Sequence, residues 1–207
     1  MNPFTSMQYW LSERSLTPLH NLNGSVIGLM YDQSRLEQHA SAALRLPVAI
    51  RQELARSSLE HRQRIAHTPT LLVDLHFDDA TWWHGVTLPL RREPGRASLR
   101  RLRDGPRLLA LNRATLHFAW HVARQDRTGA MVLLGMSDAV TTFITQVNPL
   151  DIDRYADRTV LDLRPRWLDQ PTLWHHLLVE PGGGSAERLA RLQSLQLLGA
   201  GPTPAAR

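Results

Sequence analysis

The chain has 207 residues, a formal net charge of +5 and no cysteine. The lack of cysteine excludes disulfides and thiolate metal sites, and no run of about 18 apolar residues is present to span a membrane. The first residues carry neither a basic segment nor an apolar core, so no signal peptide is predicted. We therefore expect a soluble, cytoplasmic protein.

All the basic side chains that give this charge are arginines, because the sequence contains no lysine. The codon bias of a GC-rich genome accounts for the use of arginine in place of lysine, without any functional reason. The guanidinium group also binds phosphate in a bidentate way, so a pI near 10.8 permits nucleic-acid binding without requiring it.

The N-terminal part begins with a lead-in over residues 1–20, in which Pro18 precedes the first helix. Helices are predicted over 21–45, over 47–57 with Pro47 in its first turn, and from Leu59 to Ala66. Apolar residues then alternate with polar ones from Thr70 to Phe77, a pattern typical of a strand buried on one face.

Residues 88–107 form a linker by composition, rich in arginine, proline and glycine. Two interpretations stay open: a solvated linker, or a basic arm that contacts DNA phosphates. The candidate phosphate contacts are Arg91, Arg92, Arg96, Arg100, Arg101 and Arg103.

The C-terminal part repeats this order of elements. A helix is predicted over 108–134 and ends at Gly135, and Ser137 is suited to cap the next helix, with Asp138 in its first turn. Asn148-Pro149 breaks that helix, Asp151 begins a third, and a second strand is predicted over 159–163.

A glycine joint at 182–184 follows, and Ser185 is placed to cap a short amphipathic helix. Its apolar side carries Leu189, Leu192, Leu195 and Leu198. Such a helix has no core of its own and needs a groove, either on this protein or on a partner. Residues 199–207 are expected to be disordered.

The two parts have related sequences. Leu22-Asn23 and Leu111-Asn112 begin similar helical stretches 89 residues apart, and residues 78–84 match 169–175 at four of seven positions, including a Trp-His pair. We predict a tandem duplication over 21–87 and 108–180, followed by a tail at 181–207. Each unit is too small to bury its apolar face alone and is expected to pack on the other.

No catalytic constellation is recognisable, so we predict that the protein is not an enzyme and has no cofactor. His117 and His121 have the four-residue spacing of metal ligands on a helix, but the carboxylate of a His-Glu-x-x-His site is missing, and no metal site is predicted. The repeated Trp-His pairs are interpreted as packing residues whose ring N–H is hydrogen-bonded.

The second unit resembles the D subunit of the flagellar master transcriptional activator, the FlhD family. The resemblance covers about 57 residues and is carried by Leu111-Asn112, Gln125-Asp126-Arg127, Gly129-Ala130-Met131 and Leu134-Gly135. The first unit matches less well: it keeps Leu22-Asn23, but it has no glycine at the end of its long helix. The resemblance implies a mostly α-helical fold with one short strand in each unit.

FlhD-like subunits normally form homodimers, so the resemblance implies a fused, intramolecular pseudo-dimer. It also implies a transcriptional activator that scaffolds a zinc-containing FlhC-like partner on promoter DNA, with one or two chains in each complex. The zinc would lie in the partner, because this chain has no cysteine. Related activators control the transfer of conjugative and integrative elements, and we favour that role over control of flagellar genes. The alternative is a helical interaction protein that does not act at DNA.

Overall fold

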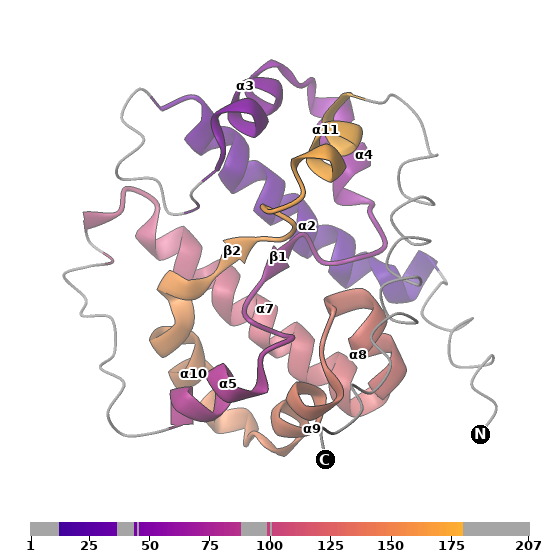
Figure 1. Cartoon of the computed structure of the whole chain (residues 1–207), viewed down its shortest axis with the longest axis vertical. Helices are drawn as coiled ribbons and strands as arrows, with labels where there is room; N and C mark the ends of the chain where they lie inside the picture. Colours follow the sequence, from indigo (N-terminus) through magenta and orange to yellow (C-terminus); the bar gives the residue numbers. More distant parts are fainter. Residues whose placement is uncertain (1–12, 37–43, 45, 88–98, 100, 180–207) are drawn as a thin grey trace, which may run out of the picture.

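Helices make up most of the computed structural model (Figure 1), which describes residues 13–36, 44, 46–87, 99 and 101–179. The N-terminal half contains α2 (Glu13–Ser34), α3 (Val48–Arg56), α4 (Leu59–Ala66), β1 (Val73–Asp74) and α5 (Ala80–Thr87). The C-terminal half contains α7 (Gly105–Gln125), α8 (Arg127–Leu134), α9 (Asp138–Gln146), the 3-10 turn η2 (Pro149–Asp151), α10 (Ile152–Thr159), the 3-10 turn η3 (Val160–Asp162), β2 (Arg164–Pro165) and α11 (Pro171–Val179).

Several helix boundaries follow from local chemistry and confirm the sequence predictions. Helix α4 has the predicted bounds, whereas Pro47 is the N-cap residue just before α3 and not part of its first turn. The Ser137 hydroxyl accepts a hydrogen bond from the Val140 N–H at the start of α9, as an N-cap serine does. Gly135 ends α8 in the left-handed conformation, with φ of +69°.

The first predicted helix is displaced along the chain. The helix expected over 21–45 lies over Glu13–Ser34 instead, and Pro18 falls inside it rather than before it. Proline removes one backbone hydrogen bond from a helix, but Leu16 and Leu19 on either side of it are buried in the core. Burial of this turn stabilises the helix where sequence propensity does not.

The long helix expected over 108–134 is interrupted. Asp126 has an extended backbone conformation between α7 and α8, and its carboxylate caps α8 by accepting from the Gly129 N–H at 2.9 Å. Helix α7 also begins at Gly105, so residues 105–107 of the predicted linker are helical.

The strands are shorter than predicted, and one lies elsewhere. Only Val73–Asp74 of the segment 70–77 pairs with another strand, and Leu71, Leu72 and Val73 are all fully buried. A one-faced strand would have exposed Leu72. The strand expected over 159–163 is wrong: η3 occupies most of it, and the paired residues are Arg164–Pro165.

The two strands form an antiparallel pair at the centre of the molecule, in which Val73 pairs with Pro165 and Asp74 with Arg164. Helices α2 and α7 run side by side behind this pair, and the remaining helices surround it (Figure 1). One hydrophobic core joins residues from both halves.

The last helix of each half packs against the other half. Helix α5 contacts α9 and α10, and α11 contacts α3 and α4. The backbone is linked across the halves as well: the Leu71 N–H donates to the Leu133 carbonyl, and the Ser137 N–H donates to the Phe77 carbonyl. Neither half therefore has a complete core of its own.

In the part of the chain that the structure describes, no single helix is long and apolar enough to cross a membrane. Helices α8 and α9 are long and apolar enough only when taken together, and the angle between them is 116°.

Candidate functional site

A buried asparagine in each long helix holds the segment that leads to the strands. The Asn23 side chain donates to the carbonyls of Thr68 and Thr70 and accepts from the Leu72 N–H, at 2.9–3.1 Å. Asn112 donates to the Ala156 carbonyl at 2.8 Å and to the Thr159 hydroxyl at 3.0 Å. In both halves, the asparagine of the Leu-Asn motif that begins each predicted unit thus holds a neighbouring segment by buried hydrogen bonds.

The tryptophans of the two Trp-His pairs are core residues. Trp83 and Trp174 are almost completely buried, whereas His84 and His175 are exposed. The Trp174 indole N–H donates to the Arg166 carbonyl at 2.7 Å, but the Trp83 N–H is buried without a hydrogen-bond partner in the described part of the chain. The predicted packing role is confirmed, and the predicted hydrogen bond holds for Trp174 alone.

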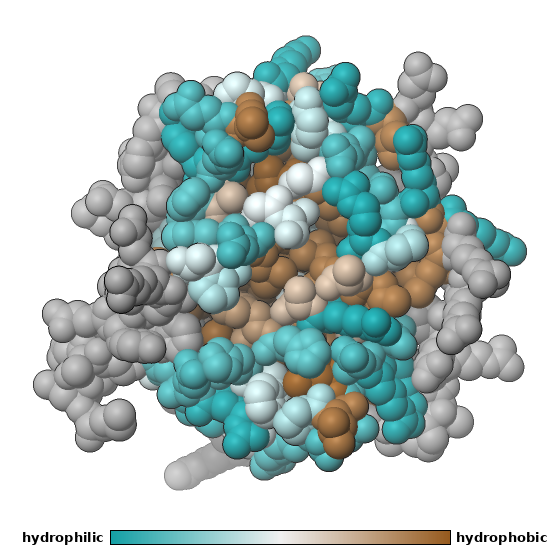
Figure 2. Space-filling model, turned by 180° about the vertical axis from the view of Figure 1, so that it is seen from behind, coloured by the Kyte–Doolittle hydropathy of each residue, from teal (hydrophilic) through white to brown (hydrophobic). Residues whose placement is uncertain are grey.

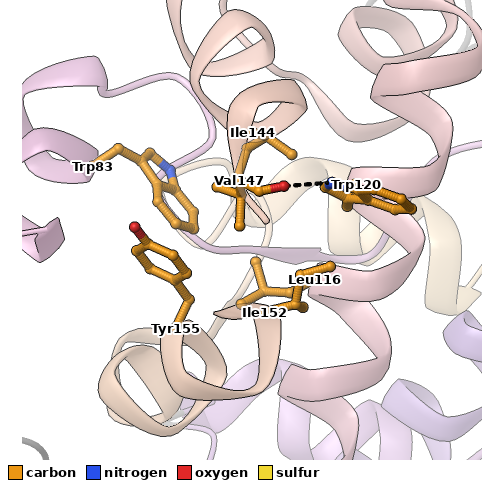
Figure 3. Close-up of a pocket in the computed structure, with 7 residues that line it drawn as sticks. All are labelled: Trp83, Leu116, Trp120, Ile144, Val147, Ile152 and Tyr155. Atoms are coloured by element: carbon orange, nitrogen blue, oxygen red, sulfur yellow. Dashed lines mark hydrogen bonds between the residues drawn. The ribbon is translucent and has the colours of Figure 1, made fainter. Parts of the chain in front are cut away.

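Trp83 lines a small apolar pocket where the two halves meet (Figure 3). Trp83 comes from α5, and the other walls come from the C-terminal half, with Tyr155 facing the indole and Trp120 donating to the Val147 carbonyl at 3.0 Å. The free space of about 10 Å³ holds roughly one water molecule. It is a packing defect rather than a ligand site.

The histidines considered for a metal site are separate from any carboxylate cluster. His117 lies 3.2 Å from Asp153 at the surface, and His121 is exposed. Among the described residues there is no group of three or more histidine, aspartate or glutamate side chains placed to hold a metal ion.

The structure places two of the six arginines predicted to contact phosphate. Arg101 and Arg103 are exposed just before α7, while Arg91, Arg92, Arg96 and Arg100 lie outside the described residues. By contrast, six arginines of the described fold form ion pairs with carboxylates, namely Arg56, Arg64, Arg107, Arg113, Arg127 and Arg164.

One arginine, Arg166, is half-buried and has a buried guanidinium Nη1. The guanidinium of Arg166 lies against Gly135 at the C-terminal end of α8, and burial lowers the pKa of Arg166 to about 10, although Asp74 and Asp78 oppose this effect. The side chain remains charged at neutral pH, close to the negative end of the α8 dipole.

Sequence reasoning did not anticipate a groove between α2 and α7. Figure 2 shows the face that these helices form, where apolar surface crosses between polar rims. The groove has a volume of about 610 Å³. Its floor is formed by the buried Leu22, Leu29 and Leu111, and its walls carry Gly24, Ser25, Gly28, Ala110 and Ala114. Arg107 crosses one end of it to reach Asp32 at 2.8 Å.

A signal for this groove is present in the sequence. Gly24 and Gly28 lie four residues apart in one long helix, and Ala110 and Ala114 have the same spacing in the other. Residues four apart share a helix face, so each helix presents a small-residue face. The predicted docking leucines, Leu189, Leu192, Leu195 and Leu198, lie outside the described residues.

Comparison with known proteins adds no relative. No protein-family model matches the chain, and neither a curated protein nor a solved structure matches it significantly.

Proposed function

We propose that the chain is a tandem FlhD-like regulator whose two units form an intramolecular pseudo-dimer. The order of elements supports this proposal: α3, β1 and α5 begin at residues 48, 73 and 80, and α9, β2 and α11 begin at 138, 164 and 171. Each pair is separated by 90 or 91 residues. The Leu-Asn motifs that begin the sequence resemblance occupy corresponding places in α2 and α7.

The strand pairing is consistent with a two-fold axis. If residues 91 apart are equivalent, Val73 corresponds to Arg164 and Asp74 to Pro165. Exchanging the units then converts the pair Val73–Pro165 into Arg164–Asp74, which is the other observed pair. Self-consistency of this kind is what an isologous contact requires.

The turns after the strands also correspond. The only residues other than glycine with positive φ in the described chain are His76 and Trp167, at 52° and 55°. They lie 91 residues apart, and the carbonyl of each accepts a backbone hydrogen bond from the residue three further on. A positive φ is rare in residues other than glycine, because it costs up to a few kcal/mol. Its recurrence at two residues 91 apart supports a common origin of the two units.

The reciprocal packing of α5 and α11 is the observation that carries the proposal. Each tail helix completes the core of the opposite unit, as expected when an intertwined homodimer is fused into one chain. Fusion makes assembly intramolecular and raises the effective concentration of each unit for the other.

By the FlhD resemblance, this pseudo-dimer acts in the cytoplasm as a transcriptional activator subunit. It scaffolds a zinc-containing FlhC-like partner on promoter DNA of a mobile element or of flagellar genes. The partner reads bases, while arginines of the linker contact phosphates without sequence preference. Leu189, Leu192, Leu195 and Leu198 are the proposed partner-docking side chains.

The test is co-purification of the chain with the cysteine-rich product of a neighbouring gene, followed by binding to promoter DNA at increasing salt. The expected result is a stable complex that shifts DNA only when both proteins are present. Replacing Arg91, Arg92, Arg96, Arg100, Arg101 and Arg103 by glutamine should weaken binding and flatten its salt dependence, by about 0.9 in slope for each lost phosphate contact.

The matched control replaces Arg56, Arg64, Arg113 and Arg127, which are ion-paired at the surface of the described fold. This control removes four positive charges against six in the linker set, so the salt slopes are compared per arginine replaced, and the control should change the slope less per arginine. Equal effects of both sets would show a diffuse electrostatic attraction instead of a linker arm. A chain that binds neither a partner nor DNA would favour the alternative, a helical interaction protein with a docking groove.

A further inference from the structure

The groove between α2 and α7 has the shape of a helix-binding site. Buried leucines of both helices form its floor, and glycine, alanine and serine form its walls. Small side chains let another helix approach closely, because interaxial distance depends on the side chains at the contact. The opening is large enough for several aliphatic side chains, at about 610 Å³.

The two glycines of this groove are not explained by packing within the described residues. A Cβ atom at Gly28 would meet nothing within 4 Å, and one at Gly24 would meet only the Ala66 Cβ at 3.9 Å. Glycine inside a helix is less favourable than alanine. A segment that lies against this face accounts for glycine at both positions.

We propose that residues 185–198 of the same chain dock in this groove with Leu189, Leu192 and Leu195 toward its floor. In a helix of 3.6 residues per turn these three leucines lie within about 120° of one another and span about 9 Å, whereas Leu198 is opposite to Leu189. His20 and Leu29, the first and last groove residues of α2, lie nine residues apart and span about 13.5 Å. The three leucines therefore fit within the length of the groove and match its apolar floor in polarity.

The connection to α11 is long enough for this docking. Helix α11 packs on α4, and the end of α4 borders the groove: Ala66 faces Gly24, and the His67 ring lies 4.7 Å from the His20 ring. Residues 180–184 span up to about 17 Å when extended, and crossing one helix takes about 10 Å. A tether this short also gives the segment a high effective concentration at the groove.

The alternative occupant is the same face of a second copy. That face presents a hollow, so two copies meeting through it would leave both floors unfilled. Good complementarity requires a convex surface against a concave one, and a single helix with a leucine stripe provides it. The proposed function adds one consequence: if these leucines also dock on an FlhC-like partner, the partner competes with the groove for them.

Cysteine pairs test the docking directly, because the native chain has no cysteine and only the introduced thiols can form a disulfide. In the full-length chain, Ser25→Cys with Leu192→Cys should form an intrachain disulfide under mild oxidation. The control pair, Gln146→Cys with Leu192→Cys, places the first thiol at an exposed position on α9 and should react at least tenfold more slowly. Equal rates for the two pairs, or no disulfide in either, would overturn the proposal.

The single variant Ser25→Cys distinguishes the second copy. A covalent dimer formed rapidly by this variant alone would place another molecule in the groove and refute intramolecular docking. The assay contains neither partner nor DNA, so its failure leaves the proposed function untouched. Conversely, a chain that binds no DNA can still form the intrachain disulfide.

Filling the groove gives a second measurement. Gly28→Leu should lower the rate of the Ser25–Leu192 disulfide by at least tenfold, because the new side chain occupies the site of the leucine stripe. Gly85→Leu is the matched control, since Gly85 is also helical with open space around its Cβ position but lies outside the groove. Circular dichroism checks that both variants fold, and an unchanged rate in folded Gly28→Leu would contradict the docking.

Discussion

At the scale of single residues, the buried asparagines of the two long helices differ in their contribution to stability. Asn23 satisfies two carbonyls and one N–H of the segment 68–72. Asn112 makes two hydrogen bonds, and its own carbonyl oxygen has no partner in the described chain. A buried polar group that loses its partner costs about 1–3 kcal/mol, so the tie in the N-terminal half is the stronger one.

We therefore predict that Asn23→Ala lowers the free energy of unfolding by about 3 kcal/mol and Asn112→Ala by about 1–2 kcal/mol. Urea denaturation of both variants measures the difference. Asn21→Ala, at an exposed position of the same helix, should change stability by less than about 0.5 kcal/mol. Equal losses at Asn23 and Asn112 would mean that helix packing, and not these hydrogen bonds, sets the cost.

Gly135 and Arg166 form a second coupled pair. Gly135 has a positive φ, and a Cβ atom there would overlap the Arg166 guanidinium. Gly135→Ala thus adds a steric cost to the left-handed strain of about 1 kcal/mol. We predict a loss of about 2–3 kcal/mol in the native chain and about 1 kcal/mol in an Arg166→Ala background.

A double-mutant cycle measured by urea denaturation tests this coupling, with Gly85→Ala as the control. Gly85 lies inside α5 and has open space at its Cβ position, so alanine should leave stability unchanged or raise it slightly. Additive effects of Gly135→Ala and Arg166→Ala would show that the guanidinium moves aside at no cost.

At the scale of elements, the break between α7 and α8 depends on one side chain. The Asp126 carboxylate caps α8 while the Asp126 backbone leaves the helical conformation. Asp126→Ala should cost about 1 kcal/mol, whereas Asp126→Asn retains an acceptor and should cost much less. Thermal unfolding followed by circular dichroism compares the two. A similar loss for both variants would assign the effect to charge instead of the cap.

The success of sequence prediction at this scale depended on local chemistry. The bounds of α4, the cap at Ser137 and the stop at Gly135 were predictable because each rests on residues within one turn of the boundary. The break at Asp126 was missed because an aspartate within an apolar periodic stretch is also compatible with a continuous helix. Helix α2 was misplaced because its inclusion of Pro18 depends on burial of Leu16 and Leu19, which only the folded chain provides.

The strands and the groove show why tertiary context was needed. Leu71 and Leu72 are both buried because the segment passes through the middle of the molecule, so alternation did not identify its faces. The spacing of Gly24 and Gly28, and of Ala110 and Ala114, is visible in the sequence. That these two faces border one groove follows only from the packing of α2 beside α7.

At the scale of the whole molecule, α5 and α11 each pack on the opposite half, and this reciprocal packing makes folding of the two halves interdependent. Trp83 on α5 lies against Phe143 of the other half, with ring centroids 5.6 Å apart, and Trp174 is fully buried on α11, which packs on α3 and α4. Replacing either tryptophan by alanine should cost about 3–5 kcal/mol. Both halves should still unfold in one transition, which hydrogen exchange of α4 and α10 can follow. Loss of protection in one helix alone would contradict this interdependence.

The same reciprocal packing of α5 and α11 predicts what happens when the chain is cut between its halves. A protease site inserted at Gly95, between α5 and α7, allows cleavage of the folded protein into two pieces. Because each piece contains a tail helix that completes the core of the other, the pieces should remain together on gel filtration. Their unfolding midpoint should then rise with protein concentration, since unfolding now includes dissociation.

The uncleaved chain with the same inserted site is the control, and its midpoint should not depend on concentration. The size of the difference reports the effective concentration that the covalent connection provides. Pieces that separate and stay folded would mean that each half forms its own core, and the fused pseudo-dimer would be wrong. Pieces that stay associated, but only above a measurable concentration, would show that the connection replaces the association step of a homodimer.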